Sequence, residues 1–186
     1  MIYPIAAYGS PVLKKKAKEV QQDHEGLEQL ISDMFETMYA SEGVGLAAPQ
    51  ISLSLRLFVI DATPFKDEEP SLDGFKKVFI NPEIIEETGD HWKFNEGCLS
   101  IPGIREDVSR NAVVVVNYLD ENFTEHEEAF TGLAARVIQH EFDHLEGVLF
   151  TDRIGPLKRQ LLKGKLNDIS KGNVDVSYRM RFPNLR

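Results

Sequence analysis

Two histidines four residues apart, His140 and His144, constrain the fold of this chain more than any other feature of its sequence. Side chains at this spacing share one face of an α-helix, so two imidazoles placed this way predict that the surrounding segment is helical. Apolar residues recur around them at helical spacing, Thr131 can cap the start of a helix, and Gly147 can end it. We therefore expect a helix between Thr131 and Gly147 with both imidazoles on one face.

Helical and strand-like patterns alternate along the rest of the chain. Residues 26–40 predict an amphipathic helix with Asp23 as its cap, and residues 156–171 predict a third helix that begins at a proline. Short alternating or β-branched stretches predict strands at residues 55–60, 77–80, 112–118, 125–130 and 174–182. Helices on either side of a strand-rich centre indicate an α+β fold.

Length and composition predict a single domain, residues 1–186. A chain of this length with 42% hydrophobic residues can bury one core, and no repeat or long linker divides it. No apolar run of about 18 residues occurs, and no basic leader precedes an apolar segment at the N-terminus, so we expect neither membrane insertion nor export. The single cysteine, Cys98, excludes an intramolecular disulfide and fits the reducing cytoplasm.

Charge is unevenly distributed along the chain. The formal net charge of −9 argues against a nucleic-acid site, because neutralising phosphates requires a basic face. Residues 157–186 nevertheless contain eight Lys or Arg and only two Asp, which gives this segment a charge of +6. The segment could dock on an anionic partner, and the alternative is a solvated helix face that has no partner.

The histidine pair indicates a metal site. His140 and His144 can turn towards one ion, and Glu141 places a carboxylate beside it without using a ligand position, as base-assisted hydrolysis requires. Cys98 offers a third ligand, since a thiolate binds zinc or ferrous iron strongly. Three protein ligands leave a position open and therefore favour catalysis over structure. The alternatives are two partly buried histidines on an amphipathic helix and a cysteine that serves as a small buried hydrophobe.

The small residues between Gly43 and Gln50, with the sequence GVGLAAPQ, suggest a place where a ligand can approach the backbone closely. The amide of Gln50 could donate a hydrogen bond to an oxyanion. Without the other motifs, a helix end followed by close packing would be the better interpretation. The segment is not a phosphate loop, because no Gly-Lys-Ser/Thr follows it.

Three segments, taken in order, resemble the signature motifs of the peptide deformylases: GVGLAAPQ at residues 43–50, EGCLS at residues 96–100 and HEFDH at residues 140–144. The resemblance extends from Tyr8 to Phe150 and so covers most of the chain. It implies an α+β fold in which antiparallel sheets surround a central HExxH helix, with one helix towards the N-terminus and one towards the C-terminus.

The resemblance also implies a reaction and a cofactor. The substrates would be N-formylmethionyl peptides, from which a bacterial, cytoplasmic enzyme releases formate as nascent chains emerge. One divalent ion would be held by Cys98, His140 and His144; the resemblance implies Fe²⁺ as the native ion and Zn²⁺, Ni²⁺ or Co²⁺ as substitutes. By analogy with the family, the basic C-terminal segment would dock on the ribosome.

Individual roles follow from the same resemblance. Glu141 would be the general base and then the acid, while Gln50 and the backbone N–H of Leu99 would bind the oxyanion. Gly45 and its neighbours would hold the peptide backbone. The full set of residues expected to contact the substrate is Val44, Gly45, Glu96, Arg105, Arg136 and Val137.

Arg136 departs from what an apolar methionine pocket would need. Arg136 and Val137 lie four and three residues before His140, so both belong to the metal-facing side of the predicted helix. Val137 suits an apolar pocket. We expect the stem of Arg136 to line the pocket while its head reaches solvent or a carboxylate such as Glu96.

Three other functions share parts of this pattern. A zinc peptidase also uses HExxH with a glutamate base, although its third ligand is more often His or Glu. A cysteine hydrolase would use Cys98 as a nucleophile activated by histidine. A metal-stabilised binding module would use the basic tail to dock on a partner and would not need Glu141.

Overall fold

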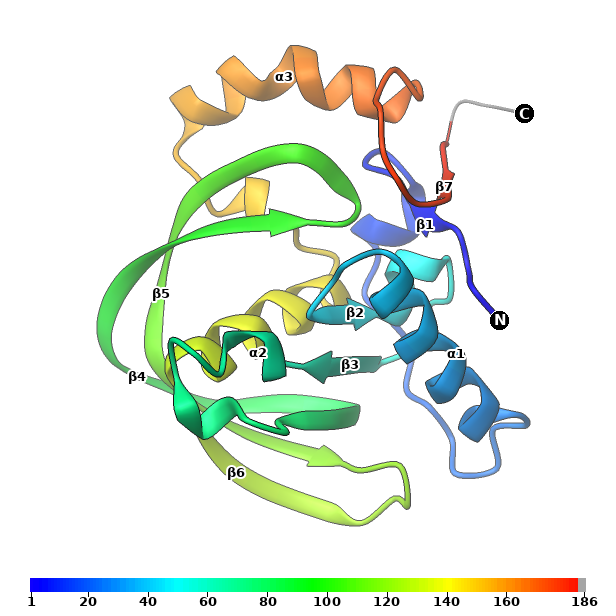
Figure 1. The fold of residues 1–186 in the computed structure, drawn as a ribbon, viewed down its shortest axis with the longest axis vertical. Coiled ribbons are helices and arrows are strands. Elements are labelled where there is room, and N and C mark those ends of the chain that lie inside the picture. Colours follow the sequence, from blue (N-terminus) through cyan, green and yellow to red (C-terminus); the bar gives the residue numbers. More distant parts are fainter. Residues whose placement is uncertain (184–186) are drawn as a thin grey trace.

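The computed structural model describes residues 1–183, and these residues form an α+β fold. Figure 1 shows a strand-rich centre with helices on more than one side of it. The three α-helices are α1 (Leu27–Ala40), α2 (Gly132–Leu145) and α3 (Pro156–Ser170). Five short 3-10 helices connect the larger elements, at Pro11–Lys14, Ala48–Ile51, Thr63–Phe65, Pro70–Leu72 and Phe150–Asp152.

The main sheet has five strands in the order β2-β3-β4-β5-β6, and every neighbouring pair is antiparallel. Its strands are β2 (Gly45–Ala47), β3 (Leu57–Asp61), β4 (Lys76–Cys98), β5 (Ile101–Leu119) and β6 (Glu125–Thr131). A second, parallel pair joins the two ends of the chain, β1 (Ile5–Ala6) to β7 (Met180–Arg181). The patterns predicted at residues 55–60, 77–80, 112–118 and 125–130 thus belong to one sheet.

Strands β4 and β5 form a long hairpin that curves past α2 in Figure 1. Its register shifts at four places, and two of these coincide with unusual backbone: Asn81 has a φ of 48° and Gly89 has a φ of 75°. Bulges of this kind add a residue to one strand and bend it. The bends let a single hairpin reach from the core around to the site.

Helix α2 packs against β2, β3, β5 and β6, and its apolar face belongs to a core cluster with Phe58, Phe79 and Val114. The start of the helix is capped from a distance: the backbone N–H of Leu133 donates to Oε2 of Glu69 at 2.9 Å. A carboxylate at this end also complements the helix dipole. The polar segment around Glu69 therefore anchors the helix that carries both histidines.

Several predicted boundaries are wrong. The strands expected at residues 77–80 and 112–118 are the first part of β4 and the last part of β5, both of which are much longer. Helix α1 is preceded by Gly26 in the left-handed conformation and not capped by Asp23. The strand expected at residues 174–182 is limited to Met180–Arg181. None of the helices in residues 1–183 combines the length and apolar character needed to cross a membrane.

Candidate metal centre and substrate pocket

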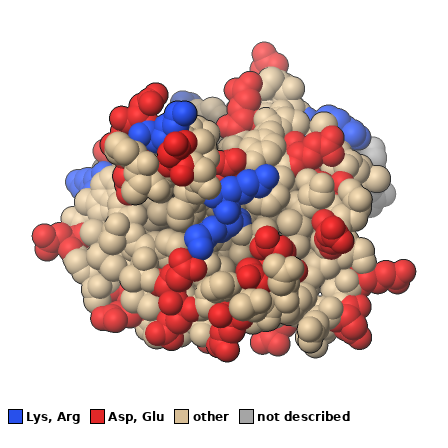
Figure 2. Space-filling model, turned by 60° about the horizontal axis from the view of Figure 1, so that its bottom comes forward, with Lys and Arg blue, Asp and Glu red and all other residues tan. Residues whose placement is uncertain are grey.

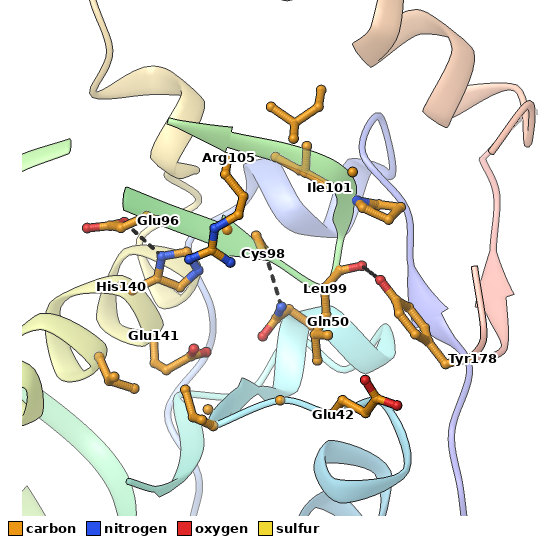
Figure 3. Close-up of a pocket in the computed structure, with 18 of the residues that line it drawn as sticks. Glu42, Gln50, Glu96, Cys98, Leu99, Ile101, Arg105, His140, Glu141 and Tyr178 are labelled. Carbon is orange, nitrogen blue, oxygen red and sulfur yellow. Dashed lines mark hydrogen bonds and ion pairs between the residues drawn. The ribbon is translucent and has the colours of Figure 1, made fainter. Parts of the chain in front are cut away.

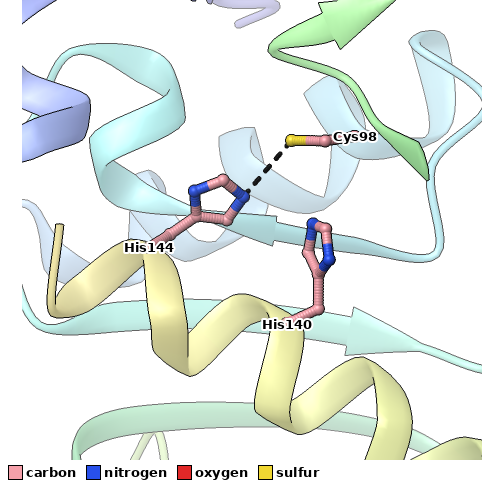
Figure 4. Close-up of side chains that lie close together, drawn as sticks. All are labelled: Cys98, His140 and His144. Carbon is pink, nitrogen blue, oxygen red and sulfur yellow. Dashed lines mark hydrogen bonds between the residues drawn. The ribbon is translucent and has the colours of Figure 1, made fainter. Parts of the chain in front are cut away.

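Cys98, His140 and His144 converge on one point between the end of β4 and the middle of α2 (Figure 4). Their candidate ligand atoms all lie within 4.8 Å of one another, and Sγ of Cys98 is 3.4 Å from Nε2 of His144. Among the described residues, this is the one group of three or more His, Cys, Asp or Glu close enough to share an ion. The structure thus brings together the three residues predicted as ligands.

The donor set fits a divalent ion. A tetrahedral ion with a metal–sulfur bond of about 2.3 Å and a metal–nitrogen bond of about 2.0 Å separates the two ligand atoms by roughly 3.5 Å. The distance between Cys98 and His144 agrees with this value. Burial lowers the pKa of His144 well below its ordinary value, so this imidazole is neutral, as a metal ligand must be. Three ligands from the protein leave one position open.

Glu96 orients the imidazole of His140. Nδ1 of His140 lies 3.0 Å from Oε2 of Glu96, and because a carboxylate can only accept, Nδ1 carries the proton. Nε2 is then free to face Cys98. Burial lowers the pKa of His140, but its hydrogen bonds to Cys98 and Glu96 outweigh burial and hold the pKa well above its ordinary value. Below that pKa, Nε2 also carries a proton, and a metal ion has to displace this second proton, so low pH opposes metal binding.

A buried arginine, Arg110, holds Glu96 in place. Its guanidinium donates from Nε to Oε1 of Glu96 at 2.7 Å and from Nη2 to Oε2 at 2.9 Å, and Nη1 reaches Asp143 at 2.8 Å. Burial alone would raise the pKa of Glu96, but Arg110 and His140 lower it far below the ordinary value. Glu96 is therefore a fixed negative charge. The sequence contained no sign of Arg110, because it lies on β5 and meets Glu96 through strand pairing.

Glu141 lies beside the ligands and is almost fully buried, with 4% of its surface exposed. Its Oε2 atom has no hydrogen-bond partner among the described residues. Burial raises the pKa of Glu141 to about 7. A carboxylate with a pKa near neutrality and a free oxygen has the properties of a general base.

Gln50, the last residue but one of the 3-10 helix Ala48–Ile51, points its amide at the same place. Oε1 of Gln50 accepts a hydrogen bond from the backbone N–H of Ala47 at 2.8 Å, which fixes the orientation of the amide. Nε2 is consequently turned towards Cys98 and lies 3.5 Å from its sulfur. Gln50 thus presents a donor of defined direction beside the metal ligands.

A cavity of about 720 Å³ opens in front of these groups. In Figure 3, Glu141, Gln50 and Arg105 come from different elements and lie around Cys98. Of the predicted site residues, those that line the cavity are Val44, Gly45, Gln50, Glu96, Cys98, Leu99, Arg105, Arg136, Val137, His140 and Glu141. His144 is buried behind the wall.

Arg136 is where prediction and structure differ most. The side chain is buried, with 1% of the residue exposed, so the expectation that its head could reach solvent is wrong. The alternative partner, Glu96, is correct: Nη1 donates to Oε1 of Glu96 at 2.9 Å. The guanidinium also donates to the carbonyl oxygen of Trp92 at 2.7 Å and lies 4.4 Å from the centre of the Trp92 ring. The curved hairpin therefore encloses a charge that a helix in isolation would expose.

Arg105 stands at the more exposed end of the cavity. Its Nε donates to Oδ1 of Asn95 at 3.0 Å, and Nη2 donates to the carbonyl oxygen of the same residue. A Cβ atom on Gly97 would lie 2.7 Å from Nη1, so the glycine leaves space for the guanidinium. Arg105 is thus held along β4 with its charge at the pocket rim.

Several parts of the wall were absent from the predicted site, among them Phe65, Phe94 and residues 101–104. Residues 175–178, between α3 and β7, contribute one side, and Glu42 contributes another. The hydroxyl of Tyr178 donates to the carbonyl oxygen of Leu99 at 2.8 Å. The alternation in residues 174–182 indicated an extended chain, but no local signal could tell that this chain passes over the cavity.

Comparison with known proteins agrees with this geometry. A family model described as polypeptide deformylase matches residues 2–160. The peptide deformylase of Christiangramia forsetii is 56% identical over 193 residues, covering 100% of this chain and 98% of that protein. The peptide deformylase of Cytophaga hutchinsonii is 56% identical over 183 residues, covering 98% of each.

Solved structures give the same result. The crystal structure of a peptide deformylase from Legionella pneumophila has a TM-score of 0.81 and 43% sequence identity, covering 93% of this chain and 98% of that one. A peptide deformylase structure from Plasmodium falciparum also has a TM-score of 0.81, with 37% identity over 90% of this chain and 95% of that one. The family model matches most of the chain, and the relative from Christiangramia forsetii is more than half identical over the whole chain. The chain therefore belongs to the polypeptide deformylase family.

Proposed function

We propose that Glu141, Gln50 and Leu99 carry out the reaction of this family at an ion held by Cys98, His140 and His144. The chain is a hydrolase that removes the N-terminal formyl group from nascent polypeptides. The observation that carries the assignment of roles is a single cavity in which a three-ligand donor set, a buried carboxylate with a free oxygen and an oriented amide donor meet. One group for each task of amide hydrolysis is therefore present.

The resident cofactor is proposed to be one divalent ion, with Fe²⁺ as the native species and Zn²⁺, Ni²⁺ or Co²⁺ as substitutes. One thiolate and two imidazoles suit all of these ions, so the donor set supports the class of ion more strongly than its identity. The chemistry supplied by such an ion is a water molecule of lowered pKa and a polarised carbonyl. The remaining steps belong to side chains of the protein.

Glu141 takes a proton from the attacking water as the water oxygen bonds to the formyl carbon. Its pKa of about 7 allows it to accept that proton and later to give it up near neutral pH. Gln50 Nε2 and the backbone N–H of Leu99 donate hydrogen bonds to the oxyanion that develops on the former carbonyl. The carbon–nitrogen bond then breaks, Glu141 returns the proton to the departing amine, and formate leaves.

The substrate side chain is proposed to enter the part of the cavity lined by Val44 and Val137. Gly45 would let the peptide backbone approach closely, and Arg105 at the rim would contact the peptide. Glu96 and Arg136 form the polar back of the pocket, where their charges already satisfy one another. The pocket therefore offers an apolar channel for methionine in front of a neutralised ion pair.

We further propose that residues 1–186 act as one catalytic domain in the cytoplasm, with α2 as the central helix enclosed by the sheets. On the face shown in Figure 2, Lys and Arg form a few small, separate groups among many Asp and Glu. This distribution argues against a nucleic-acid surface on this face, because such a surface would need a continuous basic area.

Docking on the ribosome is proposed to use α3. Lys163 and Lys165 are exposed on this helix, and Leu157 and Leu161 expose 73% and 75% of their surface. Lys158 and Arg159 contribute less to a docking surface, because Lys158 pairs with Glu106 and Arg159 donates to the carbonyl oxygens of Thr151 and Asp152. Arg186, also counted in the basic segment, lies outside the described residues.

Sedimentation with ribosomes tests the docking. The double variant Lys163→Glu, Lys165→Glu should lose salt-sensitive co-sedimentation, while Lys66→Glu, which changes an exposed lysine in a loop far along the sequence from α3, should keep it. Equal sedimentation of both variants and the unaltered protein would reject docking through α3.

Product analysis tests the reaction itself. The protein is given formyl-Met-Ala-Ser and, separately, Met-Ala-Ser, and formate and free methionine are both measured. Formate without methionine is expected. Methionine without formate would indicate a zinc peptidase, and activity that survives complete removal of metal would indicate a cysteine nucleophile.

Glu141→Gln separates an enzyme from a binding module. The variant keeps the shape of the side chain but cannot accept a proton, so turnover should fall by about 100-fold or more while the metal content stays the same. Unchanged turnover would remove Glu141 from the mechanism. The same substitution should leave docking on ribosomes unaffected.

A further inference from the structure

The turn that follows Cys98 is held by both ends of the chain. The hydroxyl of Tyr178 donates to the carbonyl oxygen of Leu99 at 2.8 Å, and the backbone N–H of Tyr8 donates to the carbonyl oxygen of Ser100, also at 2.8 Å. Tyr8 lies shortly after β1 and Tyr178 shortly before β7, and these two strands pair with each other. Two successive carbonyl groups between β4 and β5 are therefore fixed from outside the hairpin.

Leu99 is confined on its side-chain face as well. A Cβ atom on Gly43 would lie only 2.9 Å from Cδ1 of Leu99, so the leucine side chain presses against the backbone at the end of α1. The carbonyl of the same residue points towards the hydroxyl of Tyr178 in Figure 3 and accepts its hydrogen bond. With both its side chain and its carbonyl held, Leu99 has little freedom to rotate about its backbone bonds.

The direction of the Leu99 N–H depends on that restraint. An oxyanion donor is effective only if it points at the developing charge before the reaction begins, because reorientation during the reaction costs free energy. A hydrogen bond to the carbonyl of the donor residue limits rotation about both of its backbone dihedral angles. The tether from Tyr178 thus acts on the geometry of a neighbouring group that touches the substrate.

We propose that Tyr178 is a positioning residue for deformylation, which holds the Leu99 backbone so that its N–H faces the oxyanion. This inference rests on the role proposed above for Leu99. Tyr178 lies beyond residue 160, where the match to the family model ends, so the C-terminal segment supplies a part of the site that the matched region lacks.

The surroundings of Tyr178 suit a permanent tether. Its ring packs against the same core cluster as Leu99, so the hydroxyl is held in place by packing of the ring. Burial raises the pKa of Tyr178 to about 12, with a smaller contribution from Cys98, and the hydroxyl keeps its proton at neutral pH. It remains a donor throughout the range in which the enzyme would work.

Tyr178→Phe tests the proposal, because it removes the hydroxyl and keeps the ring. The matched control is Tyr3→Phe: Tyr3 packs against the same cluster, and its hydroxyl has no hydrogen bond within residues 1–183. Formate release from formyl-Met-Ala-Ser is measured for both, with kcat expressed per bound metal ion so that loss of folded or loaded protein does not count. Hydrogen exchange of the Leu99 amide is measured on the same proteins, with and without metal.

For Tyr178→Phe we expect kcat to fall about 3- to 10-fold with KM changed by less than about twofold, and the Leu99 amide to exchange faster. Tyr3→Phe should change none of these. Unchanged kcat per metal, or a rise in KM alone, would overturn the positioning role and leave Tyr178 as a piece of pocket wall. If the unaltered protein released no formate, the proposed function would fail. Faster exchange of the Leu99 amide in Tyr178→Phe would even then show that the Tyr178 hydroxyl restrains the Leu99 backbone.

Discussion

The carboxylate of Glu141 occupies the space that a side chain on Gly45 would need. A Cβ atom on Gly45 would lie 2.5 Å from Oε1 of Glu141 and 2.9 Å from its Cδ and Cγ atoms. Real Cβ atoms do not approach other atoms this closely, so one of the two groups would have to move. Glu141 can therefore take its position on α2 only if residue 45 in β2 has no side chain. The segments GVGLAAPQ and HEFDH, which contain these two residues, depend on each other for this reason.

Gly45→Ala should displace Glu141 and reduce activity. A shift of about 1 Å in a catalytic group can cost on the order of 100-fold in rate, and we expect a loss of this size in kcat for formate release. The metal content should stay the same, because the atoms nearest to the added Cβ all belong to Glu141 and not to a candidate ligand. Full activity of this variant would mean that Glu141 has another position from which it can act.

Gly164→Ala provides the matched control and a prediction of its own. Gly164 lies in the interior of α3, and nothing within 4 Å opposes a Cβ atom there. Alanine favours a helix over glycine by about 0.5–1 kcal/mol, so the free energy of unfolding should rise by that amount. Urea unfolding measures this change. Activity should not change, and a loss of activity would show that α3 is coupled to the site.

The two histidines of the candidate metal site could be predicted from the sequence because their relationship is local. His140 and His144 are related by one turn of a helix, and the spacing that makes them neighbours is visible in the sequence itself. Cys98 is the single cysteine and precedes a strand break, which limits its position to the end of a strand. Candidate site residues that are related by helix periodicity, or that belong to a rare residue type, can therefore be predicted from the sequence alone.

The length of the β4–β5 hairpin could not be predicted in the same way. Pro82 and Gly89 are residues that normally interrupt strands, yet in the structure they lie at or next to bulges within β4. Much of the hairpin beyond them is exposed and polar, so it lacks the apolar alternation of a half-buried strand. A strand that continues through bulges looks in sequence like several separate pieces.

Contacts across that hairpin were equally hidden. Glu96 pairs with Glu106 and Arg110 pairs with Trp92, so the guanidinium reaches Glu96 diagonally across the two strands, in a register that follows the shift between Gly97 and Cys98. A different register would place Arg110 on another partner or on the opposite face of the sheet. For the same reason the burial of Arg136 could not be seen: the carbonyl groups that receive its guanidinium, on Trp92 and Val108, belong to the hairpin and not to the helix.

Removal of the metal should lower the thermal stability of the protein. An ion that binds only the folded state adds about 2.7 kcal/mol to the free energy of unfolding when its concentration is 100 times its dissociation constant. The unfolding temperature should therefore fall when a chelator is added and recover when a divalent ion is restored. In Cys98→Ser the chelator should have a much smaller effect. An equal effect on both proteins would place the bound ion elsewhere.

Glu128 should contribute stability that is lost in acid. Burial raises the pKa of Glu128, but hydrogen bonds from Tyr118 at 2.6 Å and from Lys77 at 3.0 Å outweigh it and lower the pKa below 4.5. A carboxylate with a lowered pKa stabilises the folded state above its ordinary pKa, and this stabilisation disappears as pH falls through the lowered value.

The difference in free energy of unfolding between the unaltered protein and Glu128→Gln should thus be constant near neutral pH and shrink below about pH 4.5. Urea unfolding of both proteins over a range of pH measures it. Carboxyl groups far from Glu128 titrate alike in the two proteins and cancel in the difference. A difference that does not change with pH would show that Glu128 titrates normally in the folded state.

Arg136→Ile should affect both stability and the choice of substrate. The substitution removes the guanidinium from Glu96 and from the carbonyl group of Trp92, and breaking one partner of a buried ion pair costs about 3–5 kcal/mol. Arg110 still neutralises Glu96, so the smaller part of that range is expected and the protein should fold. The wall beside Val137 becomes apolar and changes shape, which should alter the ranking of first residues in a series of formyl-Met, formyl-Leu and formyl-Ala peptides compared by kcat/KM. If the ranking stayed the same while stability fell, Arg136 would support the hairpin without shaping the pocket.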